Sequence, residues 1–299
     1  MLSLSKKLGS FTLLSILAKG SLAAACSVSS GVTTGPSATN SCTITPSYYA
    51  VTVYEMGLCT SSAPLTAPTA LAAFDASMCQ KVFESTSGSE VSVSVGATSP
   101  LVGTMTRPAS GTYQYGYIKI KNEFSIKASV DLGATPPTIG GFANLASSTS
   151  PRYCATKDGV TIDNSTSFNP DSAVCAASAP TAGTITAKMT DLDGADAGNT
   201  FEVTGNNRIS VTGGSLAAHL LTSTDKLAQS TSTVTGLLGV QEFTTPVVVT
   251  DDSVGFNTAF DVSNGSTLTN GGYSTDGSNY AGFDMTFDSG PFSVIITVQ

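Results

Sequence analysis

The sequence predicts an all-β protein of antiparallel sandwich architecture with little helix. Apolar and polar residues alternate with a period of two along many short runs. These runs are rich in β-branched and aromatic residues, and Gly, Asn, Asp and Pro separate them. Strands with one apolar and one polar face are typical of antiparallel sheets that pack face to face around a core.

The alternating runs are the expected strands, and they lie at residues 91–95, 124–130, 185–189, 254–262, 283–287 and 292–298. Residues 85–88, Ser-Thr-Ser-Gly between two apolar runs, are expected to form a hairpin loop. Residues 215–229 are the one candidate for a helix, although their apolar residues are irregularly spaced.

Residues 1–25 have the layout of a secretory signal peptide. Lys6 and Lys7 precede a short apolar run, and three alanines, 23–25, end just before Cys26. We therefore expect a secreted protein, extracellular or at the cell surface. The three alanines before Cys26 also resemble a lipoprotein cleavage box, which would place a lipid anchor at Cys26 and leave an odd number of other cysteines. No apolar run after residue 25 approaches the roughly 18–20 residues that span a bilayer.

The charge balance argues against two classes of partner. Removal of residues 1–25 takes away three lysines and no acid, which leaves 10 basic and 21 acidic residues and a formal charge of −11. Such a surface repels nucleic-acid phosphates and anionic lipids, so neither is an expected partner. Charged residues make up only 11% of the chain, against about 25% in an ordinary soluble domain.

The six cysteines all follow the leader, and an even count in an exported chain favours disulfides. Pairing in sequential order closes three short loops, each contributing about 3 kcal/mol in the chain-entropy model, but the sequence leaves the connectivity open. A zinc site is not expected, because the chain has no C-x-x-C motif and one histidine. The disulfide candidates are Cys26, Cys42, Cys59, Cys79, Cys154 and Cys175.

The distribution of charge predicts two domains. Residues 26–130 hold five acids and five bases, whereas residues 131–299 hold 16 acids and five bases. We expect an N-terminal sandwich at 26–132, a linker and cysteine loop at 133–180 and an acidic β domain at 181–299. The alternative is one long sandwich with a cysteine-clipped insertion.

Residues 108–113, Pro-Ala-Ser-Gly-Thr-Tyr, lead into an alternating run at 115–120. This strand entry resembles the P-x-G-x-Y segment of secreted transthyretin-like and Cna-B-like sandwich modules. The resemblance implies a sandwich fold and a role as a stalk, spacer or adhesin part, and it carries no catalytic residues.

The sequence offers no recognised catalytic motif, and we expect a non-enzymatic protein. The one histidine, His219, lies in an apolar run and is interpreted as a structural residue. A hydrolase whose carboxylates are brought together by the fold is an alternative, although no tryptophan is present to stack on sugars.

Two groups of residues are candidates for binding. Asp191, Asp193 and Asp196 flank a glycine and are either Ca²⁺ ligands or an acidic turn; no other cofactor is expected. The other group forms either a binding stripe or part of the core, and it comprises the tyrosines 48, 49, 113, 115 and 117.

The preferred function is that of a structural or adhesive component of the cell surface: a filament, sheath, matrix or adhesin subunit. Self-association or binding to other surface proteins is expected. Residues 290–299 form an apolar terminal strand that either adds to a neighbour's sheet or closes its own domain, with the stripe Phe292, Val294, Ile296 and Val298. The alternative is a secreted module that binds a glycan or another polymer, assisted by calcium.

Overall fold

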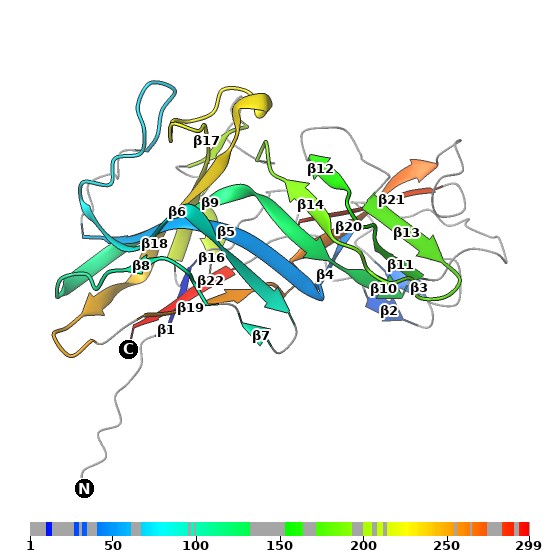
Figure 1. Cartoon of the computed structure of the whole chain (residues 1–299), viewed down its shortest axis with the longest axis horizontal. Coiled ribbons are helices and arrows are strands. Elements are labelled where there is room, and N and C mark those ends of the chain that lie inside the picture. Colours follow the sequence, from blue (N-terminus) through cyan, green and yellow to red (C-terminus); the bar gives the residue numbers. More distant parts are fainter. Residues whose placement is uncertain are drawn as a thin grey trace, which may run out of the picture.

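A computed structural model shows an all-β protein, as the alternating pattern predicts (Figure 1). The described chain forms mostly antiparallel strands and a 3₁₀ turn at Thr231–Thr233, with no α-helix. The structure describes residues 10–13, 27–29, 32–34, 41–60, 67–94, 97–98, 100–131, 153–163, 172–192, 200–204, 208–211, 214–253, 256–263, 265–273, 283–289 and 293–298.

One large sheet dominates the described chain, and its strand order is β15-β17-β18-β9-β5-β6-β7. Strand β16 pairs with β17, β8 pairs with β6, and β14 joins β12 to β9; only the β12–β14 pair is parallel. The long strands are β5 (Tyr48–Cys59), β6 (Cys79–Ser94), β9 (Gly111–Lys127), β17 (Gly214–Leu221) and β18 (Gly236–Val249). The short strands are β7 (Ala97–Thr98), β8 (Thr104–Met105), β12 (Thr161–Asp163), β14 (Ile185–Lys188), β15 (Glu202–Val203) and β16 (Ile209–Val211).

Strand β9 is the centre of this sheet. From Ile118 to Ile126 every second side chain is buried and the side chains between are half-buried, which confirms the alternation expected at 124–130. One edge of β9 pairs with β5, and the other pairs first with β18 and then with β14. At the start of β9, Tyr113 is buried and its hydroxyl donates a hydrogen bond to the Ala109 carbonyl oxygen (2.7 Å), so this tyrosine belongs to the core.

Residues 85–88 form a bulge inside β6, so the expected hairpin loop is wrong. Strand β6 pairs with β5 on both sides of these residues: Ser89 lies opposite Val53, and Glu84 lies opposite Glu55. The extra residues of β6 therefore have no counterpart in β5, which defines a β-bulge. Gly88 ends the bulge at a φ of 81°, a conformation that favours glycine.

The one helix candidate, 215–229, is also wrong, because its first half is β17 and the rest is a turn. Every residue from Leu216 to Leu221 is buried. Leu216, Ala218 and Leu220 belong to one apolar cluster and Ala217 and Leu221 to another, on the opposite face of the sheet. A strand covered on both faces loses its polar alternation, and its apolar run then resembles a buried helix.

Three smaller antiparallel sheets accompany the main sheet. Their strands are β4 (Ser41–Ile44) with β20 (Ser266–Tyr273) and β21 (Phe283–Ser289); β10 (Ser129–Asp131) with β11 (Tyr153–Thr156) and β13 (Ala173–Ala176); and β1 (Ser10–Leu13) with β19 (Phe256–Asp261) and β22 (Ser293–Val298). Strands β2 (Ser27–Ser29) and β3 (Val32–Thr34) form a separate pair.

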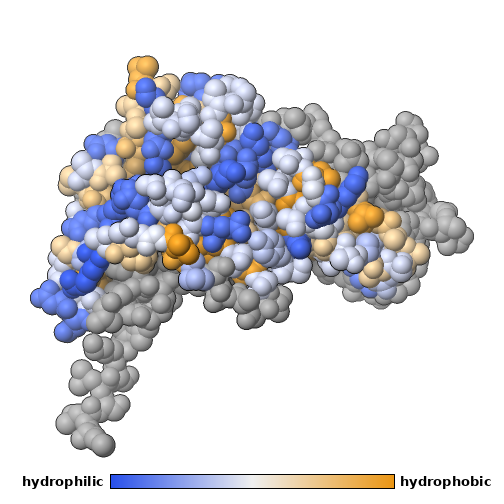
Figure 2. All heavy atoms as spheres, in the orientation of Figure 1, coloured by the Kyte–Doolittle hydropathy of each residue, from blue (hydrophilic) through white to orange (hydrophobic). Residues whose placement is uncertain are grey.

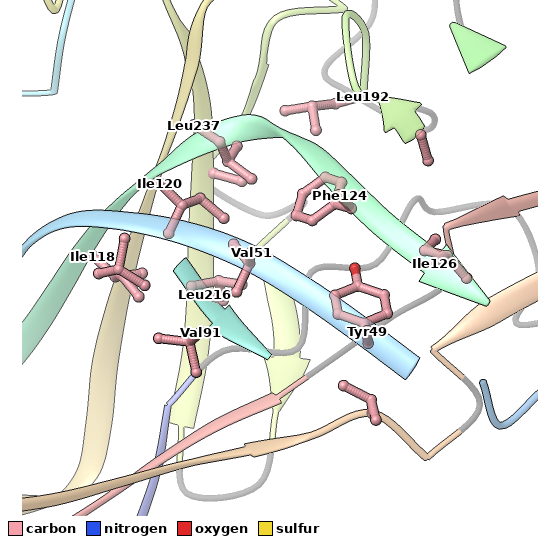
Figure 3. Close-up of a cluster of buried hydrophobic side chains, with 14 of the residues drawn as sticks. Tyr49, Val51, Val91, Ile118, Ile120, Phe124, Ile126, Leu192, Leu216 and Leu237 are labelled. Carbon is pink, nitrogen blue, oxygen red and sulfur yellow. The ribbon is translucent and has the colours of Figure 1, made fainter. Parts of the chain in front are cut away.

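A single apolar core connects the main sheet to two of the smaller ones. Tyr49 and Phe124, on β5 and β9, lie with their ring centres 5.9 Å apart (Figure 3). Leu268 of β20, Phe287 of β21 and Cys154 of β11 belong to the same buried cluster. This cluster is the core of the sandwich.

The sheet pairing crosses the expected domain boundary. Strands β14 and β18, from beyond residue 180, are hydrogen-bonded to β9, which precedes residue 133. This pairing agrees with the alternative interpretation, in which the chain forms one long sandwich.

The visible surface is mostly polar. Figure 2 shows hydrophilic side chains over much of the described surface, with hydrophobic ones in small separate areas. The exposed large apolar side chains are Leu71, Met78, Val102, Met105, Val174 and Val248. In the part of the chain described, no helix has the length and apolar character needed to cross a bilayer.

Candidate functional site

A groove of about 350 Å³ lies beside the bulge of β6, and we call it the β6 groove. Its walls come from β5, the bulge, the middle of β9, the turn after β17 and the start of β18. Its polar lining residues are Tyr54, Glu55, Glu84, Ser85, Thr86, Lys119, Thr222, Ser223, Asp225 and Thr235. The bulge itself contributes two hydroxyl side chains, Ser85 and Thr86, because it displaces β6 locally from the pleat.

Two carboxylates of the groove share one lysine. Glu55 and Glu84 lie opposite each other in β5 and β6. The Lys81 Nζ atom is 3.0 Å from Glu55 Oε2 and 2.6 Å from Glu84 Oε1. The hydrogen bond to Glu84 is the main cause of a raised pKa at Lys81. The lysine therefore stays protonated between the two acids, and its charge offsets their mutual repulsion.

Glu55 also accepts a hydrogen bond from beneath the groove. The Tyr117 hydroxyl donates to Glu55 Oε1 at 2.6 Å. Burial, and then the hydrogen bond to Glu55, raise the pKa of Tyr117. Both oxygens of Glu55 are thus engaged, which fixes the carboxylate at the wall of the groove.

The turn after β17 closes the other side of the groove. Lys119 of β9 forms an ion pair with Asp225 of this turn, with Nζ 2.6 Å from Oδ2. Asp225 has a φ of 60°, which aspartate tolerates better than most residues. The groove therefore offers carboxylate and hydroxyl acceptors, ammonium and hydroxyl donors and one half-buried tyrosine, Tyr54.

The face of the main sheet that carries the groove is also covered, further along, by a disulfide-closed segment, residues 67–78, which we call the cap. The Cys59–Cys79 bond closes it at one end. The Phe74 ring lies with its centre 5.2 Å from that of Tyr117. Backbone hydrogen bonds join the cap to the turn after β17: Leu227 N–H donates to Thr69 and Phe74 N–H donates to Asp225. The cap thus covers the second apolar cluster.

Beneath the cap is a cavity of about 150 Å³, the cap pocket. His219 lines it and is 2% exposed. His219 lies opposite Glu202 of β15, with its Nδ1 atom 3.5 Å from Glu202 Oε2. The interpretation of His219 as a buried residue in an apolar setting agrees with this position, and the structure adds Arg208 at its side in the pocket.

The disulfides of the described residues follow the sequential order. Cys59 is bonded to Cys79 and Cys154 to Cys175, and each pair joins directly opposed residues of two antiparallel strands. Cys42 is also disulfide-bonded. Cys26 lies outside the described residues, so a lipid anchor there stays a prediction.

The proposed calcium ligands fall at the edge of the described chain. Asp191 is described, whereas Asp193 and Asp196 lie outside the described residues. Among described residues no group of three or more His, Cys, Asp or Glu side chains is arranged to hold a metal ion. The calcium site therefore stays a prediction.

The five tyrosines do not form a single exposed stripe. Tyr49, Tyr113 and Tyr117 are each 1% exposed, which assigns them to the core, as one of the two interpretations requires. Tyr115 is half-buried at the cap pocket, and Tyr48 lies under the Lys127 ammonium, 5.9 Å from its ring centre.

The terminal strand is paired on both edges. Strand β22 lies between β19 and β1, with Val294 opposite Phe260 on one side and Leu13 on the other. Val294, Ile296 and Val298 are in β22, and Phe292 lies outside the described residues.

Sequence reasoning missed the polar residues that line the two hollows. Glu55 and Glu84 are 29 positions apart in the sequence, and the pairing of β5 with β6 brings them opposite each other. Arg208 has no motif around it. No family model matches this chain, and no curated protein or solved structure matches it either.

Proposed function

We propose that this chain is exported and acts as a non-enzymatic structural or adhesive component of the cell surface, assembling by β-strand addition. The proposal is carried by one observation: the strand that pairs with one edge of β22 lies inside the predicted signal peptide. Strand β1 comprises Ser10–Leu13, and the leader spans residues 1–25. Disulfide bonding supports export, because such bonds persist outside the reducing cytosol.

Cleavage before Cys26 would remove β1 and change β22 into an edge strand. Residues 294–297 then lose the partner strand opposite them. An open edge presents a row of N–H and C=O groups that can pair with another chain. The segment 293–298, Ser-Val-Ile-Ile-Thr-Val, has no charge and no proline that would prevent such pairing.

The occupant that we propose for this edge is a strand from a second copy of the chain. Low charge over the whole sequence favours this, because few charged groups must be desolvated when copies meet. Main-chain hydrogen bonds supply the affinity in this mode of recognition. Repetition from copy to copy would build a filament or sheath.

The test uses residues 26–299, refolded with disulfides formed. We expect oligomers by light scattering and filaments or lattices by electron microscopy. A peptide of residues 8–17 should block assembly, because it contains β1 and restores the missing strand. The matched control is the same peptide with Thr12→Pro, which lacks one backbone donor and disrupts strand pairing.

Two results would contradict the proposal. One is a protein that stays monomeric at every concentration tested. The other is a variant lacking residues 291–299 that folds and assembles as the full mature chain does.

A second candidate function is supported by the β6 groove, which we propose as a site for a glycan or another hydroxyl-rich polymer. Carboxylates and hydroxyls around the half-buried Tyr54 are suited to hydrogen-bond sugar hydroxyls. Titration calorimetry with a panel of soluble polysaccharides tests this. Tyr54→Ala should weaken binding, whereas Tyr153→Ala, a half-buried tyrosine of β11, should not. Absence of binding across the panel, or equal losses in both variants, would contradict it.

A further inference from the structure

We infer that the cap pocket binds a small carboxylate whose apolar body is about the size of one aromatic ring, held by the guanidinium of Arg208. This inference does not depend on how copies of the chain assemble. The pocket lies between the cap, β9, β17 and β18, on the face of the main sheet opposite the sandwich core. The β6 groove is on the same face, but the two share no lining residue, and no residue of β22 lines the pocket.

The walls of the pocket are apolar on one side. Phe74 of the cap, Ala217 of β17 and Val240 of β18 line it. Its volume, about 150 Å³, is similar to that of an engineered protein cavity that binds benzene. A ligand body of this size and character would bury its apolar surface here.

The polar end of the pocket is formed by arginine donors that no described residue accepts from. The Arg208 Nε and Nη2 atoms are buried, and neither donates a hydrogen bond to any group within the described residues. Their N–H groups lie along one edge of the planar guanidinium and form the fork that holds the two oxygens of a carboxylate. Buried donors of this kind are normally satisfied, which points to an acceptor inside the pocket.

The nearby acids leave this fork available. Glu242 faces the remaining nitrogen, with its Oε2 atom 3.8 Å from Arg208 Nη1, which is beyond hydrogen-bond distance. Neither Glu242 nor Glu202 lines the pocket. The buried Nδ1 atom of His219, another lining residue of the pocket, also makes no hydrogen bond to the described chain.

A carboxylate is favoured over an inorganic anion by the combination of these two ends. Phosphate or sulfate would satisfy the arginine but would place charged oxygens against Phe74 and Val240. A neutral aromatic molecule would fill the apolar end and leave the guanidinium without an acceptor. A ligand that combines a carboxylate with an apolar body gives the guanidinium an acceptor and also fills the apolar end of the pocket.

Benzoate is the probe for the experiment, titrated into the disulfide-bonded protein of residues 26–299 and followed by ligand-observed NMR and calorimetry. We expect saturable binding of benzoate, with benzyl alcohol and phosphate at least about tenfold weaker, as expected from the loss of a charge-assisted hydrogen bond or of apolar burial. Arg208→Met should weaken benzoate binding by about tenfold or more. Lys157→Met, an exposed change of equal charge, should leave it unaltered.

Ala217→Leu keeps the arginine and fills the apolar end, so it should also abolish binding; this second variant keeps the test decisive if Arg208→Met does not fold. Absence of saturable benzoate binding, equal binding by folded Arg208→Met, or tighter binding of phosphate than of benzoate would each overturn the inference.

Discussion

Tyr117 connects the two hollows of the main sheet. Its ring lies beneath the cap against Phe74, and its hydroxyl reaches Glu55 at the wall of the β6 groove. The position opposite it in β5 is Gly57, where an added Cβ atom would lie 2.2 Å from Cε1 of the Tyr117 ring. Gly57 is therefore required for the tyrosine to lie flat across the strand, an arrangement in which an aromatic ring covers a strand glycine.

Replacement of Tyr117 by phenylalanine tests this connection through its dependence on pH. The folded protein holds the phenolic proton more tightly than the unfolded chain, because burial and Glu55 raise the pKa of Tyr117. The stabilisation of the folded state by the protonated Tyr117 phenol is therefore fully present below a pH of about 10, the pKa of tyrosine in the unfolded chain. It is lost as the pH rises above that value. Tyr117→Phe should lower stability by about 1–3 kcal/mol at pH 7 through the lost hydrogen bond.

Above pH 10 the stability of the wild-type protein should fall more steeply than that of Tyr117→Phe, by up to about 1.4 kcal/mol per pH unit, because only the wild type has this phenol to ionise. Urea denaturation between pH 8 and 11 measures both effects. An unchanged alkaline slope would show that Tyr117 binds its proton equally in the folded and unfolded states.

At the scale of the element, the sequence predicted strands where one face is buried and the other is not. The alternation at 124–130 falls on the end of β9 and on β10, and that at 185–189 falls on β14, because one face of these strands is more deeply covered than the other. The prediction failed for β17, where both faces are covered and alternation disappears. It also failed at 85–88, because a bulge depends on the partner strand, which the local sequence does not contain.

The candidate sites show the same limit. The sequence predicted disulfides but left their connectivity open; in the structure, antiparallel pairing places Cys59 opposite Cys79 and Cys154 opposite Cys175. Arg208 and His219 are 11 positions apart, and only the pairing of β17 with β15 and β16 brings them to one cavity. Such a site has no signature in a short stretch of sequence.

At the scale of the whole molecule, the described strands on either side of the expected linker share one sheet and one core. We therefore expect a protein of residues 26–299 to unfold in a single cooperative transition with its disulfides intact. Scanning calorimetry checks this: the calorimetric and van't Hoff enthalpies should agree. A fragment of residues 26–132 should not fold, since its β9 would lose both β14 and β18. Two resolved transitions, or a folded fragment, would instead support two independent domains.

The Cys59–Cys79 bond gives the cap a dependence on its surroundings. Reduction would leave the strands of the main sheet in place but would release the segment that roofs the cavity over Arg208, at its Cys79 end. In a reducing environment the cap would thus be free to move at this end, whereas in an oxidising one the disulfide holds it over the cavity.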